Sequence, residues 1–177
     1  MGIENTNNYE TTMKKRFFPQ ETKYSCGLAS IRNVLYFCYN LEYPEDELEK
    51  IARRYSTRKV EKGGFGPRDL AKTISFFGRK NRKNFKVIFS RRGNLKLLEK
   101  KLKEGIFPII HLQNDWGGHE GGHYSFVYMI TKEKVYLFDV NPRMKYQQLM
   151  KNKFNGLWKN KKLGNEKWVM LVEKQSG

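Results

Sequence analysis

The types and spacing of a few residues suit a thiol nucleophile, and Cys26 is the first of them. It follows Ser25 at the start of SCGLASIRNVLYFCYN, which the apolar spacing predicts as one amphipathic helix over residues 25–40. Unpaired N–H groups and the positive dipole end of a helix favour thiolate over thiol, and Ser25 is a candidate N-cap. Taken alone, a cysteine at this position is more often a small buried hydrophobe, which is how we interpret Cys38.

A thiolate nucleophile needs an imidazole partner, and the imidazole needs a third group that fixes its orientation. His123 begins HYSFVYMI and Asp139 lies near the end of KVYLFDV, two β-rich runs joined by the polar turn TKEK. A hairpin that folds near residue 132 brings these two residues to neighbouring positions at its open end, because their separation is even. The alternative for Asp139 is a turn residue before Asn141-Pro142.

Gln20 is a candidate for stabilising the negative charge that develops on an attacked carbonyl. It precedes Cys26 by six residues, in the segment that leads into the predicted helix. Its side-chain amide and the backbone N–H of Cys26 are the kind of donors that an oxyanion needs.

A competing metal site is suggested by HEGGH at residues 119–123, which matches the zinc-binding pattern H-E-x-x-H. That pattern requires a helix, so that His119 and His123 lie one turn apart. GGHEGG contains four glycines, which together oppose a helix by roughly 4 kcal/mol. We therefore expect His119 and Glu120 in a loop, His123 at a strand start, and no metal.

Two blocks of the chain resemble the C39 peptidases, a papain-like family known as N-terminal domains of bacteriocin-exporting ABC transporters. QETKYSCGLASIRNVLYFCY is similar to the family's glutamine-to-cysteine segment, and GGHYSFVYMITKEKVYLFDVNP to its histidine-to-aspartate block. The resemblance covers about residues 17–158, including a weakly similar FNGLWKN. It implies a cofactor-free cysteine peptidase with Gln20 as oxyanion donor, Cys26 as nucleophile, His123 as general base and acid, and Asp139 as orienting residue.

The chain departs from the family in two ways. Ser25 stands where the family commonly has an aspartate, so the surroundings of the thiol differ. In the family, the transporter presents the double-glycine leader to the peptidase; we expect no transporter here and do not carry that specificity over. The expected substrate is a peptide or protein, and a transferase or deamidase can use the same residues.

The hydrophobic pattern predicts elements of both types. Helices are expected over 25–40, from Pro44 to about 55, from Pro67 to about 77, near 93–104 and near 146–152; strands are expected at FKVIF, IFPIIHL, HYSFVYMI, KVYLFDV and KWVMLVEK, and EKGGFG is expected to be a turn. Residues 1–16 are expected to form a flexible arm and residues 17–177 one domain. Helices followed by antiparallel strands indicate an α+β fold, papain-like by the resemblance.

The 177-residue chain carries a net charge of +17. Residues 79–103 hold eleven Lys or Arg and one acid, Glu99. A solvated basic face is the preferred interpretation, and a contact site for polyanions is the alternative. The alternative function is therefore an inactive peptidase-like protein that binds nucleic acid or an acidic partner.

Without a signal peptide or an apolar run long enough to span a membrane, we expect a cytoplasmic protein.

Overall fold

A computed structural model describes residues 16–113, 122–159 and 166–175. The predicted arm thus lies outside the described residues, except for Arg16. In chain order the elements are α2 (Cys26–Tyr39), α3 (Glu45–Arg53), α4 (Val60–Gly63), α5 (Pro67–Lys80), β1 (Phe85–Ser90), α6 (Leu95–Lys103), β2 (Ile109–Leu112), β3 (His123–Ile130), β4 (Lys134–Asp139), β5 (Tyr146–Met150), α7 (Lys151–Trp158) and β6 (Val169–Lys174).

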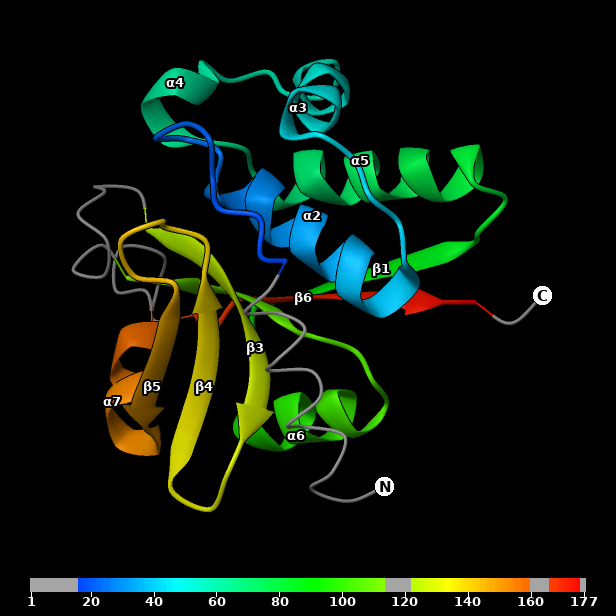
Figure 1. Ribbon diagram of the computed structural model, residues 1–177. Helices are drawn as coiled ribbons and strands as arrows, with labels where there is room; N and C mark the ends of the chain where they lie inside the picture. Colours follow the sequence, from blue (N-terminus) through cyan, green and yellow to red (C-terminus); the bar gives the residue numbers. More distant parts are fainter. Residues whose placement is uncertain (1–15, 114–121, 160–165, 176–177) are drawn as a thin grey trace.

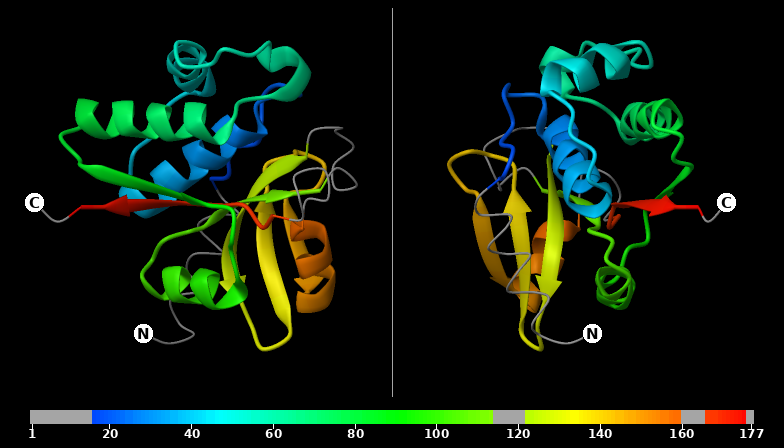
Figure 2. Two further views of the ribbon diagram at one scale, coloured as in Figure 1. Left: turned by 180° about the vertical axis from the view of Figure 1, so that it is seen from behind. Right: turned by 45° about the vertical axis from the view of Figure 1, so that its right-hand side comes forward.

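A six-stranded antiparallel sheet with the order β1-β6-β2-β3-β4-β5 forms the centre of the molecule. The last strand of the chain, β6, lies between β1 and β2. Helices α2 to α5 gather on one side of the sheet, whereas α6 and α7 lie on the other (Figures 1 and 2). The expected α+β class is confirmed.

Alternation along the strands produces a hydrophobic core on each face of the sheet. Ile109 and Met170 pack with the buried faces of α2, α3 and α5 in the first core. Their neighbours in sequence, Ile110 and Leu171, pack with Phe154 and Trp158 of α7 in the second. Because helices cover both faces of the sheet, the sequences of the central strands are nearly continuous runs of apolar residues.

Two expected elements differ from the structure in type. Residues 146–150 form strand β5 and not a helix, which begins only at Lys151. The reason is tertiary: Tyr146 to Met150 pair with β4, and Leu149 is the one of them that is buried, so strand pairing overrides a local pattern that is ambiguous. The expected turn EKGGFG begins inside the single-turn helix α4.

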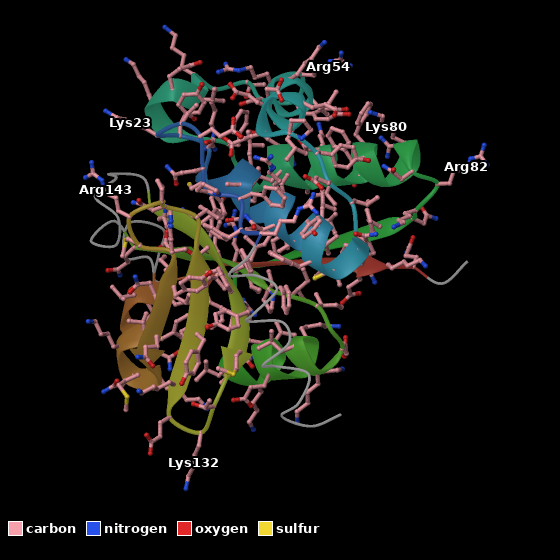
Figure 3. The ribbon with its side chains drawn as sticks, viewed as in Figure 1. Lys23, Arg54, Lys80, Arg82, Lys132 and Arg143 are labelled. Atoms are coloured by element: carbon pink, nitrogen blue, oxygen red, sulfur yellow. The ribbon has the colours of Figure 1, made fainter. Side chains whose placement is uncertain are left out.

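The basic stretch 79–103 does not form one continuous surface. It runs from the end of α5 through β1 to α6, which lies on the other side of the sheet (Figure 1). Some of its cations are paired within the protein, as Lys80 is with Glu47 and Lys101 with Glu104 and Glu173. Exposed cations occur on many sides of the molecule, and those labelled in Figure 3 point outward from several elements. In the described parts of the chain, no helix is both long and apolar enough to cross a membrane.

Candidate active site

Cys26 is the first residue of α2, as the sequence predicts. Ser25 occupies the N-cap position, but its side chain does not cap the helix. Its hydroxyl donates to the carbonyl of Thr22 (3.1 Å) and accepts from the Thr22 N–H (3.0 Å). The capping role expected for Ser25 is therefore wrong, and this residue instead ties together the short turn that precedes the cysteine.

His123 and Asp139 meet where β3 begins and β4 ends. Ser125 lies directly opposite Asp139 in the ladder, so His123 is the diagonal neighbour of Asp139 on the same face of the sheet. The start of α2 lies beside these strand ends (Figures 1 and 2). The fold thus brings together residues from the two halves of the sequence.

A short hydrogen bond joins His123 Nε2 to Asp139 Oδ1 at 2.7 Å, and both side chains are fully buried. The backbone N–H of Asn141 also donates to Oδ1 (2.8 Å), and the Ser125 hydroxyl donates to Oδ2 (3.3 Å). These donors hold the carboxylate in place and compensate for its burial. A buried and fixed carboxylate in turn fixes the orientation of the imidazole.

The electrostatics of His123 depend on Asp139 and Cys26. Burial alone lowers the pKa of His123, but the hydrogen bond to Asp139, the adjacent sulfur of Cys26 and the negative charges of both raise it to about 10. His123 Nδ1 is buried and makes no hydrogen bond of regular geometry within the described residues. Since Nε2 is bonded to Asp139, Nδ1 is the ring nitrogen left for Cys26.

Gln20 lies beside the same strand end. Its backbone N–H donates to the carbonyl of Val140 (2.8 Å), and its side-chain Nε2 donates to the carbonyl of Thr22 (2.9 Å). A primary amide has two N–H donors, so one remains after the bond to Thr22. The Gln20 Oε1 atom is buried without a hydrogen bond to the described residues.

Cys38 lies at the other end of α2, with a different environment. Burial raises the pKa of Cys38 to about 12, against the opposing effect of a backbone hydrogen bond at Phe107. No disulfide joins the two cysteines. Cys38 therefore matches the expected role of a small hydrophobe.

The geometry required for H-E-x-x-H is not present at its second histidine. His123 opens a β-strand and bonds to Asp139, whereas a zinc helix needs it in the same helical turn as His119. His119 and Glu120 lie outside the described residues. Among the residues that are described, no group of three His, Cys, Asp or Glu side chains is arranged to hold a metal ion.

Sequence reasoning missed three polar residues that support the site. Ser125 and Asn141 fix Asp139. Ser125 lies two residues after His123 and Asn141 two residues after Asp139, and this spacing was a usable signal.

The third residue, Glu45, is only 1% exposed and accepts the backbone N–H of Glu21 (3.0 Å) beneath the Gln20-to-Cys26 turn. Burial raises the pKa of Glu45, while the nearby Ser25 hydroxyl and the hydrogen bond from the Glu21 N–H oppose the rise. No sequence signal singles out Glu45, because this contact is made only in the folded chain.

Comparison with known structures identifies the same architecture in bacterial peptidase domains. The peptidase domain of Streptococcus ComA, a bifunctional ABC transporter involved in quorum sensing, superposes with a TM-score of 0.67 at 18% identity, covering 89% of this chain and 97% of that domain. A double-glycine-motif protease from an AMS/PCAT transporter, solved with its leader peptide, gives a TM-score of 0.63 at 17% identity, with 91% of each chain covered. A protein from Bacillus anthracis described as a C39-like peptidase gives a TM-score of 0.63 at 12% identity, with 92% and 96% covered.

These comparisons establish the fold, which is papain-like. No curated protein matches the chain significantly. The family model for the peptidase C39 family matches residues 14–167, which is most of the sequence and includes all the site residues described above. The chain therefore belongs to the peptidase C39 family.

Proposed function

We propose that the protein is a cysteine peptidase in which Cys26 attacks the carbonyl carbon of a peptide bond. The observation that carries the proposal is the buried imidazole of His123, bonded on Nε2 to Asp139 and raised in pKa by Cys26 as well. An imidazolium beside a cysteine stabilises the thiolate, which is the nucleophilic form. Membership in a peptidase family supports the same reaction.

In the acylation step, the sulfur of Cys26 forms a bond to the substrate carbonyl carbon, and the carbonyl oxygen becomes an oxyanion. The backbone N–H of Cys26 and the remaining N–H of Gln20 are the proposed donors to that oxyanion. As the intermediate collapses, the C–N bond breaks and His123 gives its proton to the departing amine. Asp139 keeps the imidazole oriented toward the sulfur throughout.

In the deacylation step, the now neutral His123 takes a proton from a water molecule while the water oxygen attacks the thioester carbon. The C–S bond breaks, the carboxylic acid product leaves and loses its proton to solvent, and Cys26 and His123 return to the thiolate–imidazolium pair. No redox partner or metal takes part in this cycle.

A peptide is the proposed substrate class. The structural relative from the AMS/PCAT transporter binds a leader peptide, and the family acts on peptide bonds. Identity to that relative is 17%, so we transfer the class of substrate to this chain and not a particular cleavage motif.

The test uses a cysteine-reactive peptide electrophile and the two cysteines of the chain. We expect the electrophile to modify Cys26 and to leave Cys38 unmodified at neutral pH, because a thiol with a pKa of about 12 is almost entirely protonated there. We expect Cys26→Ala to abolish peptide cleavage by at least about 1,000-fold without changing the circular dichroism spectrum. Mass-spectrometric mapping of the adduct provides the readout.

Cys38→Ala is the matched control, since it removes the other thiol of the same helix. It should retain cleavage and labelling at Cys26. The proposal fails if Cys26→Ala still cleaves peptides at the wild-type rate, or if both cysteines react equally slowly.

A further inference from the structure

Glu45 is a buried acid that takes no part in the proposed reaction cycle. It is the first residue of α3, and only 1% of it is exposed. Its Oε1 accepts the backbone N–H of Glu21 at 3.0 Å, and its Oε2 is buried as well. Burial of a carboxylate is unfavourable unless hydrogen bonds compensate for it, so the bond to Glu21 is a strong constraint. The carboxylate is therefore fixed beneath the Gln20-to-Cys26 turn.

The turn above this carboxylate contains a series of hydrogen bonds centred on Thr22. The Ser25 hydroxyl lies beside Glu45, where it opposes the rise in pKa that burial causes in this carboxyl. The same hydroxyl accepts the N–H of Thr22 at 3.0 Å and donates to the Thr22 carbonyl at 3.1 Å. That carbonyl also accepts Nε2 of Gln20 at 2.9 Å. Contacts thus run from Glu45 through Ser25 and Thr22 to the amide that is the proposed oxyanion donor.

Glu21 joins the turn to two helices. Its backbone N–H is bound by Glu45 of α3, and its side-chain Oε1 accepts from Arg32 of α2 at 2.8 Å. The Arg32 side chain is itself largely buried, at 14% exposed. Because α2 also carries Cys26, these two contacts fix the turn relative to the proposed nucleophile.

α3 holds the turn at a second point as well. Glu49, one helical turn after Glu45, accepts the hydroxyl of Tyr24 at 3.2 Å. Arg53, one turn further, donates to the same hydroxyl at 3.3 Å. Residues at intervals of four lie on one face of a helix. One face of α3 therefore contacts the turn near both of its ends, at Glu21 and at Tyr24.

The backbone of Gln20 is fixed separately, by the end of the sheet. Its N–H donates to the carbonyl of Val140 at 2.8 Å. What remains to be set is the direction of its side-chain amide, and the bond to the Thr22 carbonyl sets it. That direction decides where the second N–H of the amide points, and an oxyanion donor is effective only when it is already aimed at the developing charge.

We propose that Glu45 is a positioning residue of the oxyanion site, which holds the Gln20-to-Cys26 turn in the shape that presents the second N–H of the Gln20 amide to the oxyanion. The inference deepens the proposed peptidase function and rests on it. Glu45 is too deeply buried to contact a substrate, so it acts through the turn. The property required of it is an acceptor that reaches the Glu21 N–H, which the neutral amide of glutamine also supplies.

The first experiment measures kcat and KM with a fluorogenic peptide that the wild type cleaves, chosen from a randomised library. Glu45→Ala should lower kcat by at least about 10-fold and change KM by less than about 2-fold, because an oxyanion donor acts in the transition state. Glu45→Gln should keep kcat within about 3-fold of the wild type. Glu47→Ala is the matched control: it removes a glutamate of the same helix that bonds to Lys80 of α5 at 2.7 Å, and it should behave like the wild type.

Glu45→Asp provides a second test that does not depend on the folding of Glu45→Ala. It keeps the charge but withdraws the carboxylate by about 1.5 Å, the length of one C–C bond. It should therefore lower kcat, whereas Glu45→Gln, which keeps the reach and loses the charge, should not. Equal kcat in the wild type, Glu45→Asp and Glu45→Gln would overturn the proposal.

The second experiment asks whether Glu45 acts through Gln20. Gln20→Ala removes the donor itself, so adding Glu45→Ala in that background should change kcat by less than about 2-fold. Alkylation of Cys26 by iodoacetamide forms no oxyanion, and its rate in Glu45→Ala should stay within about 2-fold of the wild type. Effects of the two substitutions that multiply, or alkylation that falls in parallel with kcat, would assign Glu45 a general structural role instead.

The third experiment needs no cleavage. In NMR spectra, the side-chain amide signal of Gln20, assigned with Gln20→Ala, should shift in Glu45→Ala but not in Glu45→Gln or Glu47→Ala. The Glu21 N–H should exchange with solvent at least about 10-fold faster in Glu45→Ala. A wild type that cleaves no peptide counts against the peptidase, and the Gln20 signal then decides on Glu45. Cleavage with an unchanged kcat and an unshifted Gln20 signal in Glu45→Ala overturns the role of Glu45 and leaves the peptidase intact.

Discussion

Asp139 is the residue on which the charge of His123 depends most directly. Its hydrogen bond to Nε2 is the first of the effects that oppose burial, and with Cys26 it raises the pKa of His123 from 6.5 to about 10. We predict that Asp139→Asn lowers the pKa of His123 by more than about 1 unit, because it replaces a carboxylate by a neutral amide. NMR titration of histidine-labelled protein measures this shift, with His123→Gln to assign the signal.

The same substitution should change how stability depends on pH. A histidine whose pKa is higher in the folded than in the unfolded chain stabilises the fold fully below the unfolded pKa of 6.5. That contribution is lost as the pH rises through the folded pKa of about 10. The free energy of unfolding of the wild type should therefore fall over this range more steeply than that of Asp139→Asn. Asp46→Asn, at an exposed position in α3, should follow the wild type; equal slopes in all three proteins would contradict the prediction.

For individual residues, the sequence predicts which side chains lie together in the site, but not the neighbouring side chains that fix their positions. The even spacing of His123 and Asp139 predicts their proximity because a hairpin converts sequence distance into spatial distance in a regular way. Cys26 is predictable as the start of a helix from the apolar period alone. The contact of Glu45 with the Glu21 N–H depends on how α3 packs beneath a turn, which no local pattern encodes.

At the scale of elements, Gly122 controls how the chain enters β3. It has a φ of +88°, and a Cβ there would lie 2.2 Å from Cε1 of His111 and 2.8 Å from the carbonyl oxygen of Leu112. A backbone shift that relieves this collision at Gly122 would also move His123, the next residue in the chain. We predict that Gly122→Ala slows alkylation of Cys26 and lowers the free energy of unfolding by about 2–4 kcal/mol, from backbone strain plus collision. Urea titration and the rate of iodoacetamide labelling measure the two effects.

Gly105 provides the control for backbone strain. Its φ is +75°, and nothing lies within 4 Å of a Cβ placed there. Gly105→Ala should therefore cost only about 1 kcal/mol, with no effect on Cys26. If both alanine variants behave alike, then strain alone explains the cost, and the contact with His111 and Leu112 has no influence on the site.

Long and strongly periodic elements were predictable, whereas the region after Asp139 was only partly so. The predicted strand HYSFVYMI has the observed bounds of β3, because alternation and aromatic content agree along its length. In contrast, Tyr146 to Met150 carry no decisive period, and only their pairing with β4 makes them a strand. The end of α5 was placed early for a related reason: its last residues, Gly78 to Lys80, are poor in apolar side chains, and the helix continues to Asn81 as its C-cap.

At the scale of the whole molecule, both faces of the sheet contribute residues to the site. Cys26 packs against the core on the side of α2 to α5, whereas His123 is paired with Leu112 and lies on the opposite face, whose core includes Leu112 and Trp158 of α7. Trp158 is fully buried, and its Nε1 donates to the carbonyl of Trp168 at 2.8 Å. The two faces therefore contribute different residues: the core on the side of α2 to α5 supports Cys26, and the opposite face carries His123 and Asp139.

The contacts of two core residues predict different outcomes when each is replaced. Trp158 contacts Phe154 and Trp168, neither of which belongs to the site, whereas Leu70 packs at the start of α2. Trp158→Ala should lower the free energy of unfolding by about 3–5 kcal/mol and leave the alkylation rate of Cys26 unchanged in the folded protein. Leu70→Ala should cost about 2–5 kcal/mol and also change that rate, because Leu70 packs against Gly27 at the start of α2. Denaturant unfolding and labelling at low denaturant give the two quantities for each variant. Slower labelling in Trp158→Ala, under conditions where it is fully folded, would mean that packing changes at α7 reach His123 through the core they share, and the site would then depend on both cores.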